Sequence, residues 1–242
     1  MRIGPAIAIP GRSARQLAAF SPSQIAGLTF WLDAGVGITI ATGVSQWNDR
    51  SANAFNVTQA TGGNQPTFLA SDINGRPAVQ FVAASSHNLA RAASVTVPNQ
   101  AYTIFCVKKE DTVGTQRTHF SSSSSATGLS LSSTAASAYD VRFLAVASHS
   151  GGTVPTVYEV EEYTRAGTGT ANFLKINGTT VGIGGGTGDM VIGAGIGVGM
   201  FASSEFFNGK IAELIVYDSG LSGANASAVR GYLGAKYGIT VV

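Results

Sequence analysis

The stretch that decides the fold is residues 205–218, which reads EFFNGKIAELIVYD. Asn208-Gly209 is a turn signal, and the segment around it is rich in the β-branched and aromatic residues that strands prefer. Its apolar side chains do not follow a single alternation, as expected when both faces of a strand are covered. The stretch therefore predicts a long strand that bends at Asn208-Gly209 and is buried on both faces for part of its length.

A short C-terminal helix is predicted a few residues after this strand. Ser222 or Asn225 can cap its first turn, and Gly238 can end it, since glycine adopts the left-handed conformation found after many helices. We expect this helix to cover one end or edge of the sheet and to protect it from pairing with a neighbour. The apolar residues expected to make that contact are Leu214, Val216, Val229 and Leu233.

Strand patterns separated by turn clusters extend back through the chain to Leu28. About fourteen short segments of this kind lie between Leu28 and Tyr217, without helical patterns between them. Parallel α/β folds need a helix between consecutive strands, so this order favours an all-β fold with two antiparallel sheets. A chain of 242 residues can form one such sandwich. We expect a sandwich domain over residues 28–242, preceded by an extended arm over residues 1–27.

Four blocks near the start of the chain, together with the closing stretch, resemble the concanavalin A-like jelly rolls, the LamG-like or lectin/glucanase group. The blocks are residues 28–34 (LTFWLDA), 44–51 (VSQWNDRS), 65–67 (QPT) and 73–81 (INGRPAVQF). They stand in the order of that family, and the resemblance covers about residues 28–239. It implies a two-sheet antiparallel jelly-roll sandwich. Lectins, glycanases, adhesion modules and virion proteins all use this fold, so the fold alone does not define the function.

The composition limits the partners of the chain. Only 12% of its residues are charged and its net charge is +2, which is too small to indicate nucleic acid binding. No segment has the roughly 18 apolar residues of a membrane span, and two prolines interrupt any secretory signal in residues 1–12. The single cysteine, Cys106, lies in an apolar run and is expected to be a buried thiol. We expect synthesis in a host cytoplasm, with neither nucleic acid nor membrane as a partner.

The first 27 residues differ from the rest of the chain and are predicted to form a docking arm. All of their charged residues are arginines, because the first acidic residue is Asp33. An arm of this length has no core of its own, so we expect it to lie on a partner subunit; the alternative is that it wraps along its own sandwich. The residues expected to make the attachment are Arg2, Ile7, Ile9, Arg12 and Arg15.

The arm and its link to the first strand resemble LamG-like proteins from the structural regions of tailed phages. The likeness is carried by residues 1–4 (MRIG) and 21–28 (SPSQIAGL). It implies a non-enzymatic bacteriophage virion protein, a homo-oligomer or multicopy component that forms a head decoration, fibre or tail appendage. Its partners would be other virion proteins, capsid or tail subunits, and a host surface glycan. The alternative is a bacterial carbohydrate-binding or adhesion module, and a third interpretation is a glycanase.

Glu159 and Glu161 are the nearest match to a catalytic pair, since alternate positions on a strand share one face. Two carboxylates on one face can cleave glycosidic bonds. The glycanase signature of the resembling family has an aspartate between two glutamates, and this aspartate is missing here. We therefore expect both glutamates to lie on the solvated outer face of a strand, and we predict no catalytic residues.

Calcium is the only cofactor that the sequence leaves open. Relatives in the resembling family often hold Ca²⁺ at the rim of the sandwich, and the candidate ligands are Asp49 with Asn48, and Asp72 with Asn74. Residues 81–89 lack the carboxylates that this loop often carries, which argues against the metal. Asp49 is instead expected to accept hydrogen bonds from backbone amides in its turn. The three histidines have no metal-ligand spacing, so we predict no cofactor.

Overall fold

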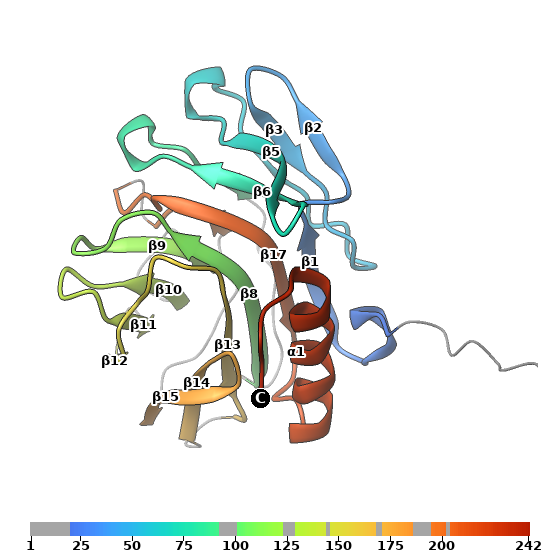
Figure 1. Cartoon of the computed structure of the whole chain (residues 1–242), viewed down its shortest axis with the longest axis vertical. Coiled ribbons are helices and arrows are strands. Elements are labelled where there is room, and N and C mark those ends of the chain that lie inside the picture. Colours follow the sequence, from blue (N-terminus) through green and yellow to red (C-terminus); the bar gives the residue numbers. More distant parts are fainter. Residues whose placement is uncertain are drawn as a thin grey trace, which may run out of the picture.

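The computed structural model describes the chain in separate segments. They are residues 20–91, 101–122, 129–143, 146–167, 171–185, 195–201 and 204–242. Within them the chain folds into two antiparallel β-sheets and one α-helix (Figure 1). No helix in this part of the chain is long and apolar enough to span a bilayer. The predicted attachment residues lie outside the described segments: Arg2, Ile7, Ile9, Arg12 and Arg15.

Sheet A has the strand order β15-β14-β13-β8-β17-β6-β5, and β1 also pairs with β17. All of these pairings are antiparallel. The strands are β1 (Leu28–Asp33), β5 (Thr67–Ile73), β6 (Arg76–Phe81), β8 (Tyr102–Glu110), β13 (Glu159–Arg165), β14 (Ala171–Ile176), β15 (Thr179–Gly185) and β17 (Gly209–Tyr217).

Sheet B has the strand order β12-β11-β10-β9-β16-β7-β4-β3-β2, and it packs against sheet A to form a sandwich. Its strands are β2 (Ile38–Ile40), β3 (Val44–Trp47), β4 (Val57–Thr58), β7 (Leu89–Arg91), β9 (Arg117–Ser121), β10 (Leu129–Ser133), β11 (Tyr139–Phe143), β12 (Val146–Gly151) and β16 (Ile196–Val198). The predicted fold class is confirmed. Strands β2, β7 and β15 were not predicted, because β2 and β7 are only three residues long and β15 is rich in glycine. A single strand was expected over residues 141–147, where the structure has β11 and β12. The strand expected over residues 189–193 lies outside the described segments.

The strand predicted from residues 205–218 is β17, and its side chains enter two separate hydrophobic clusters. The predicted bend at Asn208-Gly209 was wrong, because β17 begins at Gly209 and Asn208 precedes the strand. The spacing from Ile211 to Leu214 departs from a two-residue alternation because a β-bulge lies between Ile211 and Glu213. The prediction that both faces are buried is confirmed. The cluster between the sheets receives Ile211, Leu214 and Val216, and the opposite face receives Ala212, Ile215 and Tyr217.

The C-terminal helix, α1 (Gly223–Tyr237), begins and ends at residues that the sequence indicated. Ser222 Oγ accepts a hydrogen bond from the amide of Asn225, and Gly238 ends the helix in the left-handed conformation, with φ of 68°. In Figure 1, α1 lies against β17 and β8 on the side away from β9–β12. The main apolar residues at this contact are Phe105, Val107, Ile215, Tyr217, Val229 and Leu233.

The prediction of what α1 covers was wrong in two respects. The helix packs on the outer face of sheet A and not on an edge, because β17 has neighbouring strands on both sides. Leu214 and Val216 are not its partners, since strand alternation turns them toward sheet B. The helix therefore forms a third layer over part of sheet A.

The first described residues already contact this third layer. Phe20 and Ile25 pack against the hydrophobic cluster between sheet A and α1, and the hydroxyl of Tyr217 donates to the carbonyl of Pro22 at 2.9 Å. The two tryptophans lie in the core. Trp47 is fully buried between the sheets, and Trp31 is buried under α1.

Candidate functional site

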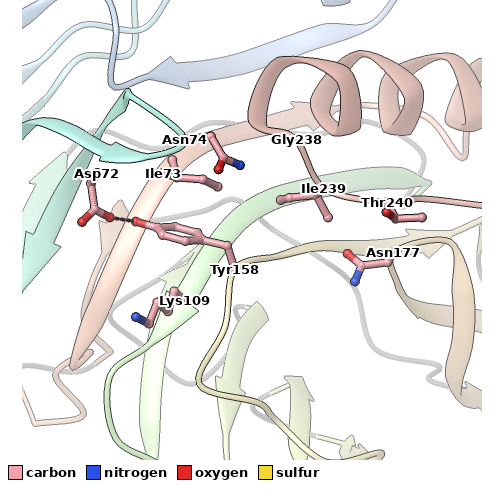
Figure 2. A pocket seen from close by; sticks show the side chains of 9 residues that line it. All are labelled: Asp72, Ile73, Asn74, Lys109, Tyr158, Asn177, Gly238, Ile239 and Thr240. Carbon is pink, nitrogen blue, oxygen red and sulfur yellow. Dashed lines mark hydrogen bonds between the residues drawn. The ribbon is translucent and has the colours of Figure 1, made fainter.

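A polar pocket of about 530 Å³ opens on the outer face of sheet A, next to the C-terminal end of α1 (Figure 2). It is assembled from the β5–β6 turn, the end of β8, the residue before β13, the β14–β15 turn and the segment after α1. Its size lies in the usual range for small-molecule sites, about 300–1,000 Å³. The lining residues are Asp72, Ile73, Asn74, Lys109, Tyr158, Asn177, Gly238, Ile239 and Thr240.

Two Asn-Gly turns supply the two asparagines of the pocket. Asn74-Gly75 joins β5 to β6 and Asn177-Gly178 joins β14 to β15, each as a two-residue hairpin loop. All four residues have positive φ, between 49° and 90°, which is the geometry of a type I′ turn. Asparagine tolerates this left-handed conformation better than most residues, so the same dipeptide shapes both turns.

One end of each asparagine amide is held by the fold, and the other end is available to a ligand. Asn74 Nδ2 donates to the carbonyl of Tyr237 at 2.5 Å, and Asn177 Oδ1 accepts from the amide of Val160 at 2.8 Å. No described residue bonds Asn74 Oδ1 or Asn177 Nδ2. The pocket therefore contains one oriented acceptor and one oriented donor.

Tyr158 lies in the middle of these residues and directs its hydroxyl toward Asp72 (Figure 2). The hydroxyl donates to Asp72 Oδ2. Burial, the hydrogen bond and the negative charge of Asp72 raise the pKa of Tyr158 above its usual value of 10, so the phenol stays neutral. The bond fixes the ring and leaves Asp72 Oδ1 as a further acceptor within the described part of the chain.

Lys109 brings a positive charge to the pocket from β8. Alternation along this strand points Lys108 toward sheet B and Lys109 toward the outer face. The Lys109 side chain is partly buried. Together with the asparagines, Asp72 and Thr240, it offers donors and acceptors around an aromatic ring. Such a set can exchange hydrogen bonds with a ligand that carries several hydroxyl groups.

The predicted position of Glu159 and Glu161 was wrong. Both side chains lie between the two sheets and are 2–3% exposed. Lys108 Nζ lies 2.8 Å from Glu159 Oε1 and 3.3 Å from Glu161 Oε2, and His119 Nε2 lies 3.0 Å from Glu161 Oε1. Tyr139 donates to the second oxygen of Glu159 at 2.5 Å. Because β13 is an interior strand of sheet A, the face shared by the two glutamates is turned toward sheet B.

The pKa values of the glutamates in this interior cluster are set by burial and by the neighbouring Lys108 and His119. Burial alone would raise the pKa of Glu161, but His119 and Lys108 outweigh it and lower the pKa to about 2. At Glu110, in the same cluster, burial has the larger effect and raises the pKa. Glu161 is therefore ionised at neutral pH and paired with the buried ammonium of Lys108. The cluster joins the sheets and has no exposed surface on which a polysaccharide could lie.

The structure separates the two candidate calcium ligands. Asp49 is engaged in its own turn, since Oδ1 accepts from the amides of Trp31 and Ser51 and Oδ2 accepts from the amide of Phe55, each at 2.8 Å. This is the turn role expected for Asp49. Asp72 lies in the polar pocket instead. In the described segments, no three His, Cys, Asp or Glu residues are grouped to hold a metal ion. The absence of a cofactor stays a prediction.

Sequence reasoning missed most of the pocket. Asp72 was considered only as a metal ligand, and Lys109, Tyr158 and Thr240 were not considered for any site. One signal was present, because the second Asn-Gly dipeptide between two strand patterns indicates a hairpin turn at Asn177. No sequence spacing links this turn to the β5–β6 turn, since the segments that line the pocket lie far apart in the chain.

Comparison with known proteins places the fold among β-sandwich domains. No protein-family model matches the chain, and no curated protein matches it. The binding domain of Paraclostridial Mosquitocidal Protein 1 superimposes with a TM-score of 0.64 at 10% identity, covering 86% of this chain and 52% of that chain. A sialidase of Trypanosoma rangeli gives 0.60 at 11% identity, covering 88% and 33%. Domain 4 of the arabinanase AbnA from Geobacillus stearothermophilus, solved with arabinotriose, gives 0.58 at 15% identity, covering 84% and 98%.

At these identities the likeness is one of fold. The chain spans about a third of the sialidase and about half of the mosquitocidal binding domain. The fold is that of a two-sheet antiparallel β-sandwich domain, which is the architecture implied by the sequence resemblance. The three structures named are a sialidase, a toxin binding domain and an arabinanase domain, so they supply no link to a phage particle.

Proposed function

We propose that the protein is a non-enzymatic carbohydrate-binding module whose sugar site is the polar pocket around Tyr158. The observation that carries this proposal is the pocket itself, in which amide, carboxylate, ammonium and hydroxyl groups surround a fixed aromatic ring. Carbohydrates need many directional hydrogen bonds together with apolar contact to the faces of the sugar ring, and aromatic residues with a polar end suit both. The arabinanase domain solved with arabinotriose supports the proposal, because it has this fold over nearly its whole length.

The arrangement of carboxylates supports binding without hydrolysis. Most glycoside hydrolases use two carboxyl groups that flank the bond to be cleaved. Among the described residues that line the pocket, Asp72 is the only carboxylate. Glu159 and Glu161 are buried between the sheets and paired with Lys108, so they do not reach a sugar bound at the outer face.

A panel of neutral and acidic oligosaccharides, tested by glycan array and calorimetry on the full chain, tests the proposed site. Tyr158→Ala should abolish binding by removing the ring. Asn177→Asp should weaken it, since the variant keeps the Oδ1 that holds the Val160 amide but loses the Nδ2 donor. Val157→Ala is the matched control, because Val157 is 61% exposed, precedes Tyr158 and does not line the pocket. Unchanged binding by Tyr158→Ala would move the sugar site elsewhere.

We also propose, as a second function, that residues 1–27 attach the sandwich to a larger assembly, with a bacteriophage virion as the location. The observation that favours it is an arm whose only charges are Arg2, Arg12 and Arg15. A truncated chain tests this attachment. Because Phe20 packs on the sandwich, the truncation should remove residues 1–19 only. The truncated chain should melt like the full chain but no longer sediment with purified particles. If it still does, the arm is not the attachment device.

A further inference from the structure

We propose that the sugar bound in this pocket is acidic, and that the Lys109 ammonium holds its single anionic group, a carboxylate or a sulfate ester. This inference rests on the proposed function, because it names the class of glycan that the same pocket would take. It goes further in assigning one residue the selection of charged sugars over neutral ones. The argument depends on the surroundings of Lys109 and Asp72.

Lys109 differs from the other lysines in having no acidic partner. The chain has five lysines, and all of them lie in described segments. No described residue forms an ion pair or hydrogen bond with the side chain of Lys109. The other four form ion pairs, which are Lys108 with Glu159, Lys175 with Glu162, Lys210 with Asp111 and Lys236 with Glu213.

The strand register explains why Lys109 has no partner. It lies opposite Lys210 in the β8–β17 pairing, so its cross-strand neighbour is another cation. Asp111 is the acid two residues further along, and Lys210 Nζ contacts both of its oxygens, at 2.7 and 3.0 Å. Glu110 points to the other face of the sheet, into the cluster between the sheets. The Lys109 ammonium therefore lies at the pocket without an acidic side chain as its partner.

Asp72 shares the pocket with Lys109 but does not neutralise it. The two side chains form no ion pair, and Asp72 Oδ2 is occupied by the Tyr158 hydroxyl. A positive and a negative group thus line the same pocket separately. A sugar with one acidic group and several hydroxyls fits this pair, because the acid can bind Lys109 while a hydroxyl donates to Asp72.

The positive charge of Lys109 makes this contact selective. Its ammonium can form a charge-assisted hydrogen bond with an anionic group of the ligand, and such bonds are roughly twice as strong as those between neutral groups. A neutral sugar hydroxyl in the same place gives a weaker bond. Asp72 also limits the total charge of the ligand. Heavily sulfated chains would bring a second anion near its carboxylate, so we expect them to bind less well than singly charged sugars.

Matched ligand pairs separate this inference from sugar binding in general. Calorimetry on the full chain would compare galacturonic acid with its methyl ester, and lactose with 3′-sialyllactose and 3′-sulfolactose. The acidic member should bind about tenfold more tightly or better, as expected for one charge-assisted hydrogen bond. The sialyl and sulfo arms show which acid the pocket takes. Lys109→Gln should remove the difference between the pairs, and Lys109→Arg should keep it.

Lys175→Gln is the control for the loss of one positive charge. Lys175 does not line the pocket, and its partner Glu162 retains Arg230, so the preference for acidic sugars should persist in this variant. Equal affinity for acid and ester, or a preference that survives Lys109→Gln, would overturn the inference. If neutral sugars then bind and Tyr158→Ala abolishes their binding, the proposed function stands alone. Binding of no sugar in the panel would overturn both proposals.

Discussion

The indole Nε1 of Trp31 donates a 2.7 Å hydrogen bond to Glu213 Oε1, joining two residues 182 positions apart in the chain. Trp31 belongs to β1, and Glu213 lies beside the bulge of β17, facing α1. The same carboxylate accepts from Tyr232, Lys236 and Tyr237 of the helix, at 3.0, 2.7 and 2.9 Å. The opening and closing blocks of the sequence therefore meet in one buried polar cluster under α1.

Glu213→Ala should destabilise the protein by about 3–5 kcal/mol, the usual cost of removing one partner of a buried ion pair. The variant leaves the indole, two phenols and an ammonium without their shared acceptor. Trp31→Phe should cost less, because it deletes a single donor and keeps most of the ring. Urea unfolding followed by tryptophan fluorescence and far-UV dichroism measures both. A Glu213→Ala variant as stable as the wild type would show that water replaces the cluster.

The stability of the protein should fall at acid pH because of Glu161. Its pKa is about 2 in the folded protein and 4.5 ordinarily, so the folded state favours the ionised form. The resulting stabilisation, about 3 kcal/mol, is present above pH 4.5 and is lost as pH falls toward 2. Glu110 and Glu213 have raised pKa values through burial, so they oppose this trend by lowering stability as pH rises above 4.5.

Urea midpoints measured from pH 2 to pH 7 check these opposite signs. Stability should rise slightly as pH is lowered from neutrality toward 4.5 and then drop below it. Glu161→Gln should flatten the acid part of the profile, since the variant cannot titrate there. An unchanged acid limb in Glu161→Gln would assign the pH dependence to other groups.

Glu159→Gln should lower the stability of the protein. Sugar binding and the rate of polysaccharide hydrolysis should stay the same as in the wild type. The variant leaves Lys108 with a weaker partner in a site that is 1–2% exposed, and breaking a buried pair costs about 3–5 kcal/mol at most. Wild type and variant should both release no sugar from β-glucans above a heat-inactivated control. Reducing-sugar assays and thermal melts measure the two effects. Turnover that depends on Glu159 would contradict the non-enzymatic proposal.

Gly75 and Gly178, in the two Asn-Gly turns that line the pocket, offer a matched pair of substitutions. Gly75 has φ of 76° and nothing within 4 Å of where a Cβ would lie, so Gly75→Ala should cost about 1 kcal/mol of conformational strain. Gly178 has φ of 90°, and a Cβ there would lie 2.0 Å from the carbonyl oxygen of Val242. Gly178→Ala should therefore cost clearly more, by about 1–3 kcal/mol, and displace the end of the chain. Similar melting of the two variants would show that this end moves aside freely.

Sequence reasoning worked where one segment carries its own signal. The Asn208-Gly209 turn, the apolar run after it and the caps at Ser222 and Gly238 predicted β17 and α1 because each signal is local. The side of β17 that α1 covers could not be obtained this way. Both faces of the strand are apolar, and the bulge beside Glu213 shifts the alternation that would distinguish them.

The two glutamates show a second limit. The prediction that Glu159 and Glu161 share one face of a strand was correct. The prediction that this face is exposed was wrong, because it was based only on the charge of the two residues. Their partners Lys108 and His119 come from β8 and β9. A single sequence does not indicate that these side chains contact the two glutamates. The pocket is hidden for a similar reason, since turns and chain ends from distant segments form it only after both sheets and α1 have assembled.

The sharing of β17 between two hydrophobic clusters has a consequence for how the molecule comes apart. Leu214 and Val216 belong to the cluster between the sheets, while Ile215 and Tyr217 belong to the cluster under α1. Unfolding that displaces β17 from one cluster therefore also exposes the apolar side chains that β17 contributes to the other. We expect the helix layer and the sandwich to melt in a single cooperative transition, with coincident curves from fluorescence and dichroism. A chain cut after Ser219 would leave an apolar sheet face in water and should collect in inclusion bodies, not behave as a smaller native domain.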